Sequence, residues 1–265
     1  MIDQGHGSPI VLIPGLQGRW EWMMPTVDAL SARHRTFSFS LNDTNAAKAP
    51  ERAFDVWVDE IDRLLDRAGE RQAAIAGVSF GGLVAACYAA RRPSRTSALV
   101  LISAPAPRWR WDHPMANYVS RPRLALPLFM AHAAGRLLPE FRALDVRSGS
   151  RLRFLAQHVG RVIRFPASPT FMAACVRAWD ATDITAECRR VTAPTLVVTG
   201  EPELDRVVPV RATLEYQTLI RGARHVTLER TGHLGVISRP RELAALVTTF
   251  IDDRGAASPV VDKVG

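Results

Sequence analysis

The chain has 265 residues, of which 47% are hydrophobic and 23% charged. This composition is ordinary for a globular protein, and the length suits one large α/β domain with an insertion. No apolar run approaches the ~20 residues that span a bilayer, no secretory signal is visible, and no nucleic-acid-binding module accompanies the net charge of +8, so we expect a cytoplasmic protein that binds no nucleic acid.

Short apolar runs alternate with amphipathic segments through the first hundred residues. Strands are predicted over residues 10–13, 35–43, 72–79 and 97–105, and helices over 20–32, 53–69 and 80–92. Strands that alternate with helices of this length predict a mostly parallel, doubly wound sheet with helices on both faces.

The alternation stops between residues 108 and 191, where helical stretches punctuated by proline replace strands. We interpret this segment as an inserted helical lid. Residues 108–192 also hold fourteen arginines and only six acids, which accounts for the whole net charge. Such a segment can attract an anionic ligand or a phospholipid surface. Since 32 of the 34 basic residues are arginines, a compositional origin is the alternative.

The sheet resumes after the insertion. Strands are predicted over residues 193–201 and 224–232, and helices over 211–220 and 240–253. The expected organisation is therefore a core of residues 1–107 and 192–254, a lid of residues 108–191 and a flexible tail of residues 255–265.

The sequence GVSFGG at residues 77–82 places Ser79 at a sharp turn between a buried strand and a helix. Glycines at 77, 81 and 82 suit such an elbow, because side chains would obstruct the strained turn and the close packing of the helix. A serine hydroxyl becomes a nucleophile when a histidine takes its proton and a carboxylate orients that histidine. His233 follows the last predicted strand and Asp205 follows the preceding one, at the strand ends where sites gather in parallel sheets.

Through these residues the chain resembles the α/β-hydrolase fold family, and within it the branch that has a serine nucleophile and a helical lid. The resemblance extends from about Ile10 to Asp252. The elbow, the order Ser79, Asp205, His233 and the acid before an x-V-V-P turn are those of the family. The resemblance implies that Ser79 attacks an acyl carbon, His233 acts as base and then acid, and Asp205 orients the imidazole.

The identity of the acid has alternatives. The family's usual position, three residues after the strand-end glycine, is Glu203, whereas Asp205 fits the R-V-V-P sequence that follows it. A carboxylate at either position can serve, because geometry defines the orienting acid. We favour Asp205 over Glu203, with Asp112 a distant third.

Two backbone donors are expected to stabilise the oxyanion: the N–H of Phe80, directly after the nucleophile, and the N–H of Leu16 in the turn P-G-L-Q-G at residues 14–18. Proline at position 14 departs from the family's histidine, so support for this turn must come from elsewhere, for which Gln17 and Trp22 are candidates. The short N-terminus is a second departure. We expect the family's N-terminal hairpin to be truncated at that edge of the sheet.

The leading hypothesis is a serine hydrolase that cleaves an ester, thioester or lactone. An acyltransferase or carbon–carbon bond hydrolase with the same triad is the first alternative, and a non-catalytic ligand-binding protein on a hydrolase scaffold is the second. The expected partner is a small molecule with an apolar acyl group and an anionic portion, and peripheral membrane contact is a weaker expectation. No metal or nucleotide motif occurs, so no metal and no cofactor are expected.

Two further sets of residues carry expectations. The three cysteines should be reduced, buried thiols. Aromatic residues of the insertion can line an apolar pocket or form its core: Trp109, Trp111, Phe129, Phe171 and Trp179.

Overall fold

The computed structural model describes residues 1–41, 49–109, 118–143 and 148–256, with 148–155 and 254–256 described for the backbone only. The strands are β1 (Ile2–Gln4), β2 (Pro9–Ile13), β3 (Arg35–Ser38), β4 (Ala73–Val78), β5 (Thr96–Ile102), β6 (Thr195–Thr199) and β7 (Arg224–Thr227). The helices are α1 (Met24–Leu30), α3 (Ala53–Ala68), α4 (Phe80–Arg91), α6 (Leu126–Ala143), α7 (Ser148–Arg164), α8 (Pro169–Asp180), α9 (Ile184–Arg190), α10 (Val210–Thr213), α11 (Glu215–Leu219), α12 (Gly235–Ser238) and α13 (Pro240–Ala256), with short 3-10 turns η1 (Trp20–Met23), η2 (Pro50–Arg52) and η3 (Pro93–Arg95).

The seven strands form one sheet in the order β1-β3-β2-β4-β5-β6-β7. Every neighbouring pair from β3 to β7 is parallel, and only β1 runs antiparallel to its neighbour β3. The predicted mostly parallel α/β sheet is therefore confirmed. At the edge where we expected a truncated hairpin, a single three-residue strand is present, with Ile2 opposite Ser38 and Gln4 opposite Thr36.

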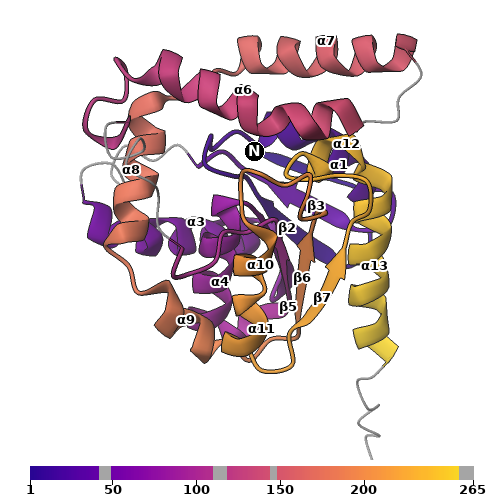
Figure 1. Ribbon diagram of the computed structural model, residues 1–265. Helices are drawn as coiled ribbons and strands as arrows, with labels where there is room; N and C mark the ends of the chain where they lie inside the picture. The colour runs from indigo at the N-terminus through magenta and orange to yellow at the C-terminus, as the bar shows by residue number, and fades with distance from the viewer. Residues whose placement is uncertain (42–48, 110–117, 144–147, 257–265) are drawn as a thin grey trace, which may run out of the picture.

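Helices cover both faces of the sheet (Figure 1). Alternate residues of β2 show the division: Val11 and Ile13 belong to the core beneath α3, α4 and α9, whereas Ile10 and Leu12 belong to the core beneath α1 and α13. Period-two alternation between two apolar layers explains why these strands are apolar at every position. The carboxyl ends of the parallel strands thus meet at one rim between the two layers.

The predicted elements are found, with differences at their ends. The helix predicted over 20–32 begins as the 3-10 turn η1, and the strand predicted over 35–43 ends at Ser38. The helix predicted over 211–220 is split into α10 and α11, and the strand predicted over 224–232 ends at Thr227. The last helix extends to Ala256, two residues into the expected tail.

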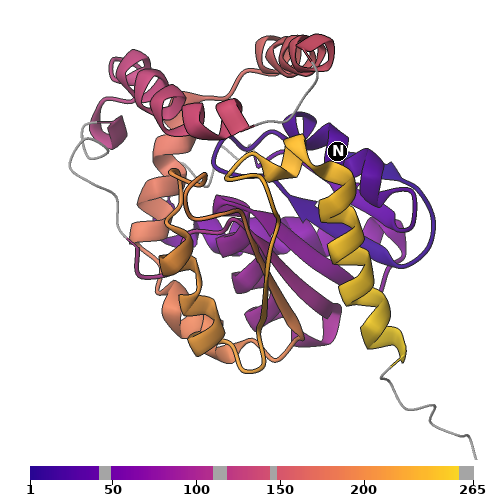
Figure 2. The same ribbon diagram turned by 45° about the vertical axis from the view of Figure 1, so that its right-hand side comes forward.

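The segment between β5 and β6 contains α6, α7, α8 and α9. Figures 1 and 2 show α6 and α7 beyond one end of the sheet, outside the layers that cover its faces. In contrast, α9 packs on α4 and α8 packs beside α3, so these helices continue the layer on that face. None of the helices in the described ranges has both the length and the hydropathy required to cross a bilayer.

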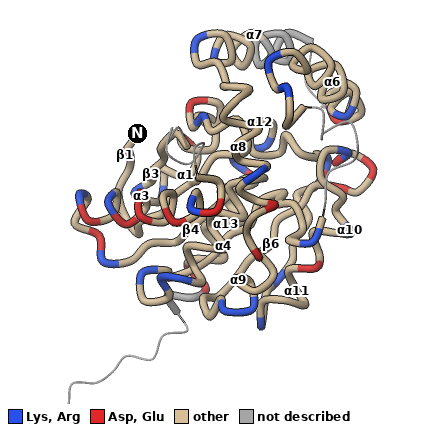
Figure 3. Tube along the Cα trace, turned by 90° about the vertical axis from the view of Figure 1, so that its left-hand side faces the viewer, with Lys and Arg blue, Asp and Glu red and all other residues tan. Residues whose placement is uncertain are grey.

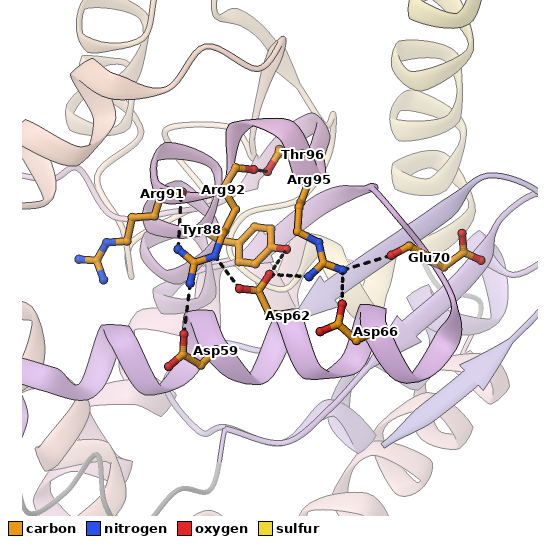
Figure 4. A network of polar contacts seen from close by, with 9 residues as sticks. All are labelled: Asp59, Asp62, Asp66, Glu70, Tyr88, Arg91, Arg92, Arg95 and Thr96. Carbon is orange, nitrogen blue, oxygen red and sulfur yellow. Dashed lines mark hydrogen bonds and ion pairs between the residues drawn. The ribbon is translucent and has the colours of Figure 1, made fainter.

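A polar network ties α3 to the C-terminal end of α4 and to η3 (Figure 4). At its centre, Asp62 accepts hydrogen bonds from Tyr88 Oη at 2.9 Å, Arg92 Nε at 2.5 Å and Arg95 Nη1 at 3.0 Å. Arg95 also contacts Asp66 at 2.7 Å. Figure 3 shows the acidic residues along α3 from the outside. Because α4 carries the residue after Ser79 at its N-terminus, this network fixes the helix on which the elbow depends.

Candidate active site

Ser79 occupies the turn between β4 and α4 in a conformation that L-residues rarely adopt. Its φ is 52° and its ψ is −123°. A non-glycine residue with positive φ is strained, and such strain persists only where the surroundings impose it. Here β4 is buried along its whole length on one side of the turn, and α4 is almost completely buried on the other. The hydroxyl is therefore presented at the carboxyl end of the sheet, as predicted for an elbow.

The elbow glycines are required by close backbone contacts. A Cβ atom on Gly77 would lie 2.1 Å from the carbonyl oxygen of Gly81, and one on Gly81 would lie 2.4 Å from the carbonyl oxygen of Pro14. A Cβ atom on Gly82 would lie 2.4 Å from Cβ of Ala104. Each approach is far inside van der Waals distance, so larger residues would move α4 away from the sheet. The predicted steric role of these glycines is confirmed.

The turn at residues 14–18 lies against the elbow. A Cβ atom on Gly15 would be 3.4 Å from Cβ of Ser79, and the N–H of Gly18 closes the turn by donating to the carbonyl oxygen of Gly15 at 2.8 Å. Leu16, between them, is 7% exposed. Phe80 is the first residue of α4, so its N–H has no partner within the helix and lies at the positive end of the helix dipole. Two backbone donors thus belong to segments that meet beside Ser79.

Phe171 of α8 and Leu41 both support this turn, since the N–H of Leu41 donates to the carbonyl oxygen of Gly18 at 3.0 Å. A Cβ atom on Gly18 would be only 2.6 Å from the ring of Phe171, and that ring also packs 6.5 Å from the ring of Trp57. Trp22, one of the candidates for this support, instead donates its Nε1–H to the carbonyl oxygen of Phe165 at 3.0 Å. Oε1 of Gln17, the other candidate, would lie 3.5 Å from a Cβ atom on Gly15.

Asp205 and His233 are brought together from the loops after β6 and β7. Nδ1 of His233 lies 3.4 Å from Oδ2 of Asp205, an ion-pair contact without hydrogen-bond geometry, and the two side chains are 15% and 1% exposed. The other oxygen, Oδ1, accepts N–H bonds from Val207 at 3.1 Å and Val208 at 2.9 Å, which fix the carboxylate. Glu203 is exposed, and Asp112 lies outside the described residues together with Trp111.

The two loops interlock through backbone contacts that only glycine permits. A Cβ atom on Gly200 would be 2.5 Å from the carbonyl oxygen of Thr231, and one on Gly232 would be 2.6 Å from the carbonyl oxygen of Leu204. The N–H of Glu201 donates to Thr231 at 2.8 Å. The acid and the histidine are therefore held in register by the backbones that carry them.

The environment of His233 acts on its pKa in opposite directions. Burial lowers the pKa, while the nearby carboxylate of Asp205 and the charge of Glu140 raise it. The net effect is a pKa above the usual value for histidine. The surrounding carboxylates thus stabilise the imidazolium form, as is needed in a histidine that accepts a proton during a reaction.

The chain beyond His233 crosses toward the elbow side of the sheet. It forms α12, which packs on α1 and η1, and the hydroxyl of Thr26 in α1 donates to the carbonyl oxygen of Val236. Val236 shares one apolar cluster with Val78, the residue before Ser79. Since β7 is an edge strand and α1 packs on β3 near the other edge, the segment after His233 runs from β7 back across the sheet to α1 and η1.

The cysteines offer no reactive thiol, and the described residues form no metal site. The three cysteines are unpaired and buried, as predicted, and burial raises their pKa, that of Cys188 to about 12, so these thiols stay protonated. In the described parts of the chain, no three His, Cys, Asp or Glu side chains gather as a metal site.

The aromatic residues of the insertion pack mainly with one another. Trp179 is 1% exposed and lies 5.9 Å from the ring of Trp109, and Phe129 stacks on Tyr118 at 4.6 Å. These contacts favour the interpretation of the aromatics as core.

Glu140 was not anticipated as part of the site. It is the fourth-last residue of α6, yet its carboxylate is 1% exposed and contacts the backbone on both sides of His233. The sequence gives only a weak indication of this role for Glu140, because it is a single acid that follows a proline in an otherwise apolar and basic helix.

Comparisons with known proteins agree with this architecture. A model of the alpha/beta hydrolase fold family matches residues 8–240. The chain is 28% identical over 254 residues to the pimeloyl-(acyl-carrier protein) methyl ester esterase of Nitrosomonas europaea, covering 91% of this chain and 94% of that protein. It is 26% identical over 274 residues to the 2-hydroxymuconate semialdehyde hydrolase of Pseudomonas sp. strain CF600, covering 97% and 91%. The crystal structure of the enol-lactonase from Burkholderia xenovorans LB400 has the same fold, with a TM-score of 0.71, 22% identity and 95% of each chain covered.

Proposed function

The chain belongs to the α/β-hydrolase fold family and is a hydrolase, and from this premise we propose that it cleaves an ester, thioester or lactone through an acyl-enzyme on Ser79, with His233 as the base and Asp205 as its orienting acid. The observation that carries the proposal is the strained backbone of Ser79, with φ of 52°, at the rim where the His233–Asp205 pair lies. Three non-glycine residues of the described chain have a positive φ, Ser79, Ser103 and Arg230, and of these Ser79 alone stands between a buried strand and the first residue of a buried helix. Strain at such a turn supports a functional role for the residue that bears it.

In the proposed reaction, Oγ of Ser79 attacks the acyl carbon while Nε2 of His233 accepts its proton. The N–H groups of Leu16 and Phe80 donate to the oxyanion that develops. The C–O or C–S bond then breaks, His233 returns the proton to the leaving alkoxide or thiolate, and the acyl group remains on Ser79. Water repeats the sequence, releasing a carboxylic acid and free Ser79. The chemistry uses no cofactor.

The choice of acid separates two carboxylates in the same loop. Asp205→Asn should lower kcat on a p-nitrophenyl ester by about 10⁴-fold, because the amide no longer holds the imidazole in the required tautomer. Glu203→Gln is the matched control. Since Glu203 is exposed, its neutralisation should leave kcat within about twofold. The reverse pattern would identify Glu203 as the acid, and full activity in both variants would contradict the proposed triad.

Hydrolysis must be distinguished from acyl transfer, carbon–carbon cleavage and simple ligand binding. With a series of p-nitrophenyl esters, we expect the free carboxylic acid to remain the main product when an alcohol or thiol is added as a competing acceptor. A dominant new ester or thioester would support an acyltransferase. Turnover of a β-diketone in place of esters would support carbon–carbon cleavage, and tight binding without turnover would support a binding protein.

The insertion between β5 and β6 supports the proposed class of substrate. We assign residues 108–191 the role of a lid, on the evidence that α6 contacts the histidine loop through Glu140 and α8 contacts the turn at residues 14–18. Among the residues whose side chains the structure describes, six of the seven large apolar ones that are exposed lie between residues 124 and 163. Exposed arginines accompany them, at positions 121, 123, 142 and 164. An apolar acyl group with an anionic portion is complementary to this surface.

A further inference from the structure

Glu140 is the single buried residue of the eighteen that form α6. The rest of the helix is half-buried or exposed, and Leu128, Met130 and Leu138 are 54%, 54% and 44% exposed. A carboxylate is among the costliest side chains to bury, and it is buried only where partners compensate for its lost hydration. The contact that inserts α6 into the body of the protein is therefore a polar one with a specific set of partners.

Those partners are all donors on the loop that carries His233. Oε1 of Glu140 accepts from the hydroxyl of Thr231 at 2.5 Å, from the N–H of Gly232 at 2.8 Å and from the N–H of Leu234 at 2.9 Å. Oε2 accepts from the N–H of Leu234 at 2.9 Å. Hydrogen bonds from N–H groups to a carboxylate are stronger than those between neutral groups. The carboxylate thus holds the backbone directly before and directly after His233.

The same loop is held from the opposite side by the acid loop. A Cβ atom on Gly232 would lie 2.7 Å from the backbone nitrogen of Asp205, so the loop has no room to move toward β6. Asp205 contacts the imidazole itself, whereas Glu140 contacts the backbone that carries it.

We propose that Glu140 is a positioning residue that holds the loop carrying His233, residues 231–234, against α6. His233 then has its working orientation only while α6 is packed on this loop. This inference rests on the proposed function of His233 as the base. It extends that function by giving the insertion a role in the chemical step: α6 completes the site through one carboxylate, and its displacement would release the loop.

The electrostatics point in the same direction as the geometry. Two carboxylates face His233 from different elements, Asp205 from the loop after β6 and Glu140 from α6, and the charge of each raises the pKa of the imidazole against the effect of burial. As pH falls, His233 becomes protonated and can no longer act as a base, so the acid limb of kcat/KM reports its pKa in the free enzyme. Removing the charge of Glu140 therefore moves this limb to lower pH.

The test is Glu140→Gln, compared with wild type for kcat, KM and the pH profile of kcat/KM on a p-nitrophenyl ester. The amide would turn an N–H donor toward the N–H of Leu234, so we expect kcat to fall by about 10²-fold with KM little changed, as for a misplaced catalytic group. We also expect the acid limb to shift to lower pH. A loss of stability alone would lower the active fraction without moving the limb, and that result would overturn the proposal.

Two further variants separate the charge from the contacts. Thr231→Val removes the hydroxyl donor and keeps the charge, so it should lower kcat by less than Glu140→Gln and leave the acid limb in place. Glu140→Asp keeps the charge but withdraws the carboxylate by one methylene. We therefore expect kcat to fall while the acid limb of the pH profile stays where it is. This variant also provides the test if Glu140→Gln does not fold. A folded Glu140 variant with the kcat of the wild type would contradict the proposed positioning role of Glu140. Ester turnover that survives His233→Ala would instead contradict the proposed function.

Discussion

Ser79→Ala should reduce ester turnover by about 10⁶-fold, the loss measured when a triad serine is removed from another hydrolase. Without Oγ no acyl-enzyme forms, and only the oxyanion donors and substrate binding remain to assist water. Labelling by a fluorophosphonate probe should vanish with activity. The free energy of unfolding should change by less than about 1 kcal/mol, because Ser79 is half-buried and its hydroxyl is not needed to hold the backbone turn.

Ser103→Ala is the matched control. Ser103 also has a positive φ, of 44°, and also follows a parallel strand, the neighbouring β5. It is 6% exposed, and it lacks the glycine-lined elbow and the helix that begins directly after Ser79. We expect this variant to keep kcat within about threefold of wild type and to keep its labelling. Persistent labelling of Ser79→Ala, or its loss in Ser103→Ala, would show that the nucleophile is misassigned.

Gly77→Ala should be the most damaging single-methyl substitution for stability. The added carbon would lie 2.1 Å from the carbonyl oxygen of Gly81, 2.4 Å from its carbonyl carbon and 2.6 Å from the backbone nitrogen of Gly82. These are backbone atoms at the start of α4, so relief of the clash requires α4 to move from the sheet. We expect the free energy of unfolding to fall by about 3 kcal/mol, the upper range for overpacking. Any folded fraction should lose about 10²-fold in kcat, because the elbow moves with the helix.

Gly135→Ala adds the same methyl group as Gly77→Ala, but we expect it to raise the free energy of unfolding. A Cβ atom at Gly135 of α6 would meet nothing within 4 Å. Alanine is favoured over glycine within a helix, so the free energy of unfolding should rise by about 0.5–1 kcal/mol. Denaturant unfolding of both variants, followed by circular dichroism, measures the difference. Equal stability of Gly77→Ala and wild type would mean that the tight contact between β4 and α4 can relax at little cost.

Much of the fold was predictable because its signals are local. β2, β4 and β5 are short apolar runs bounded by turn residues, and α3 has apolar residues at helical spacing followed by Gly69, which has φ of 73°. The elbow was predictable for the same reason, since Gly77, Ser79 and Gly81 lie within five residues. Element ends were less accurate, as in β3 and β7, because hydrogen-bonding partners on other strands decide where a strand stops.

The candidate site was predictable only as a set of residue types at strand ends. The pairing of His233 with Asp205, at 3.4 Å, follows from parallel strand order and from two loops that interlock at Gly200 and Gly232. The contribution of α8 to the turn at residues 14–18 had no sequence signal, because Phe171 and Gly18 are more than 150 residues apart.

The amino-acid sequence by itself determined the α/β class, the strand and helix content and the strained turn at Ser79, because each depends on interactions among neighbouring residues. Only the tertiary structure decided which carboxylates surround His233. Asp205 and Glu140 reach it from elements 28 and 93 residues away in the chain. Contacts of that separation depend on how α6 and the loops after β6 and β7 pack, and the energy of burying an acid such as Glu140 is recovered only when all of its distant donors are assembled.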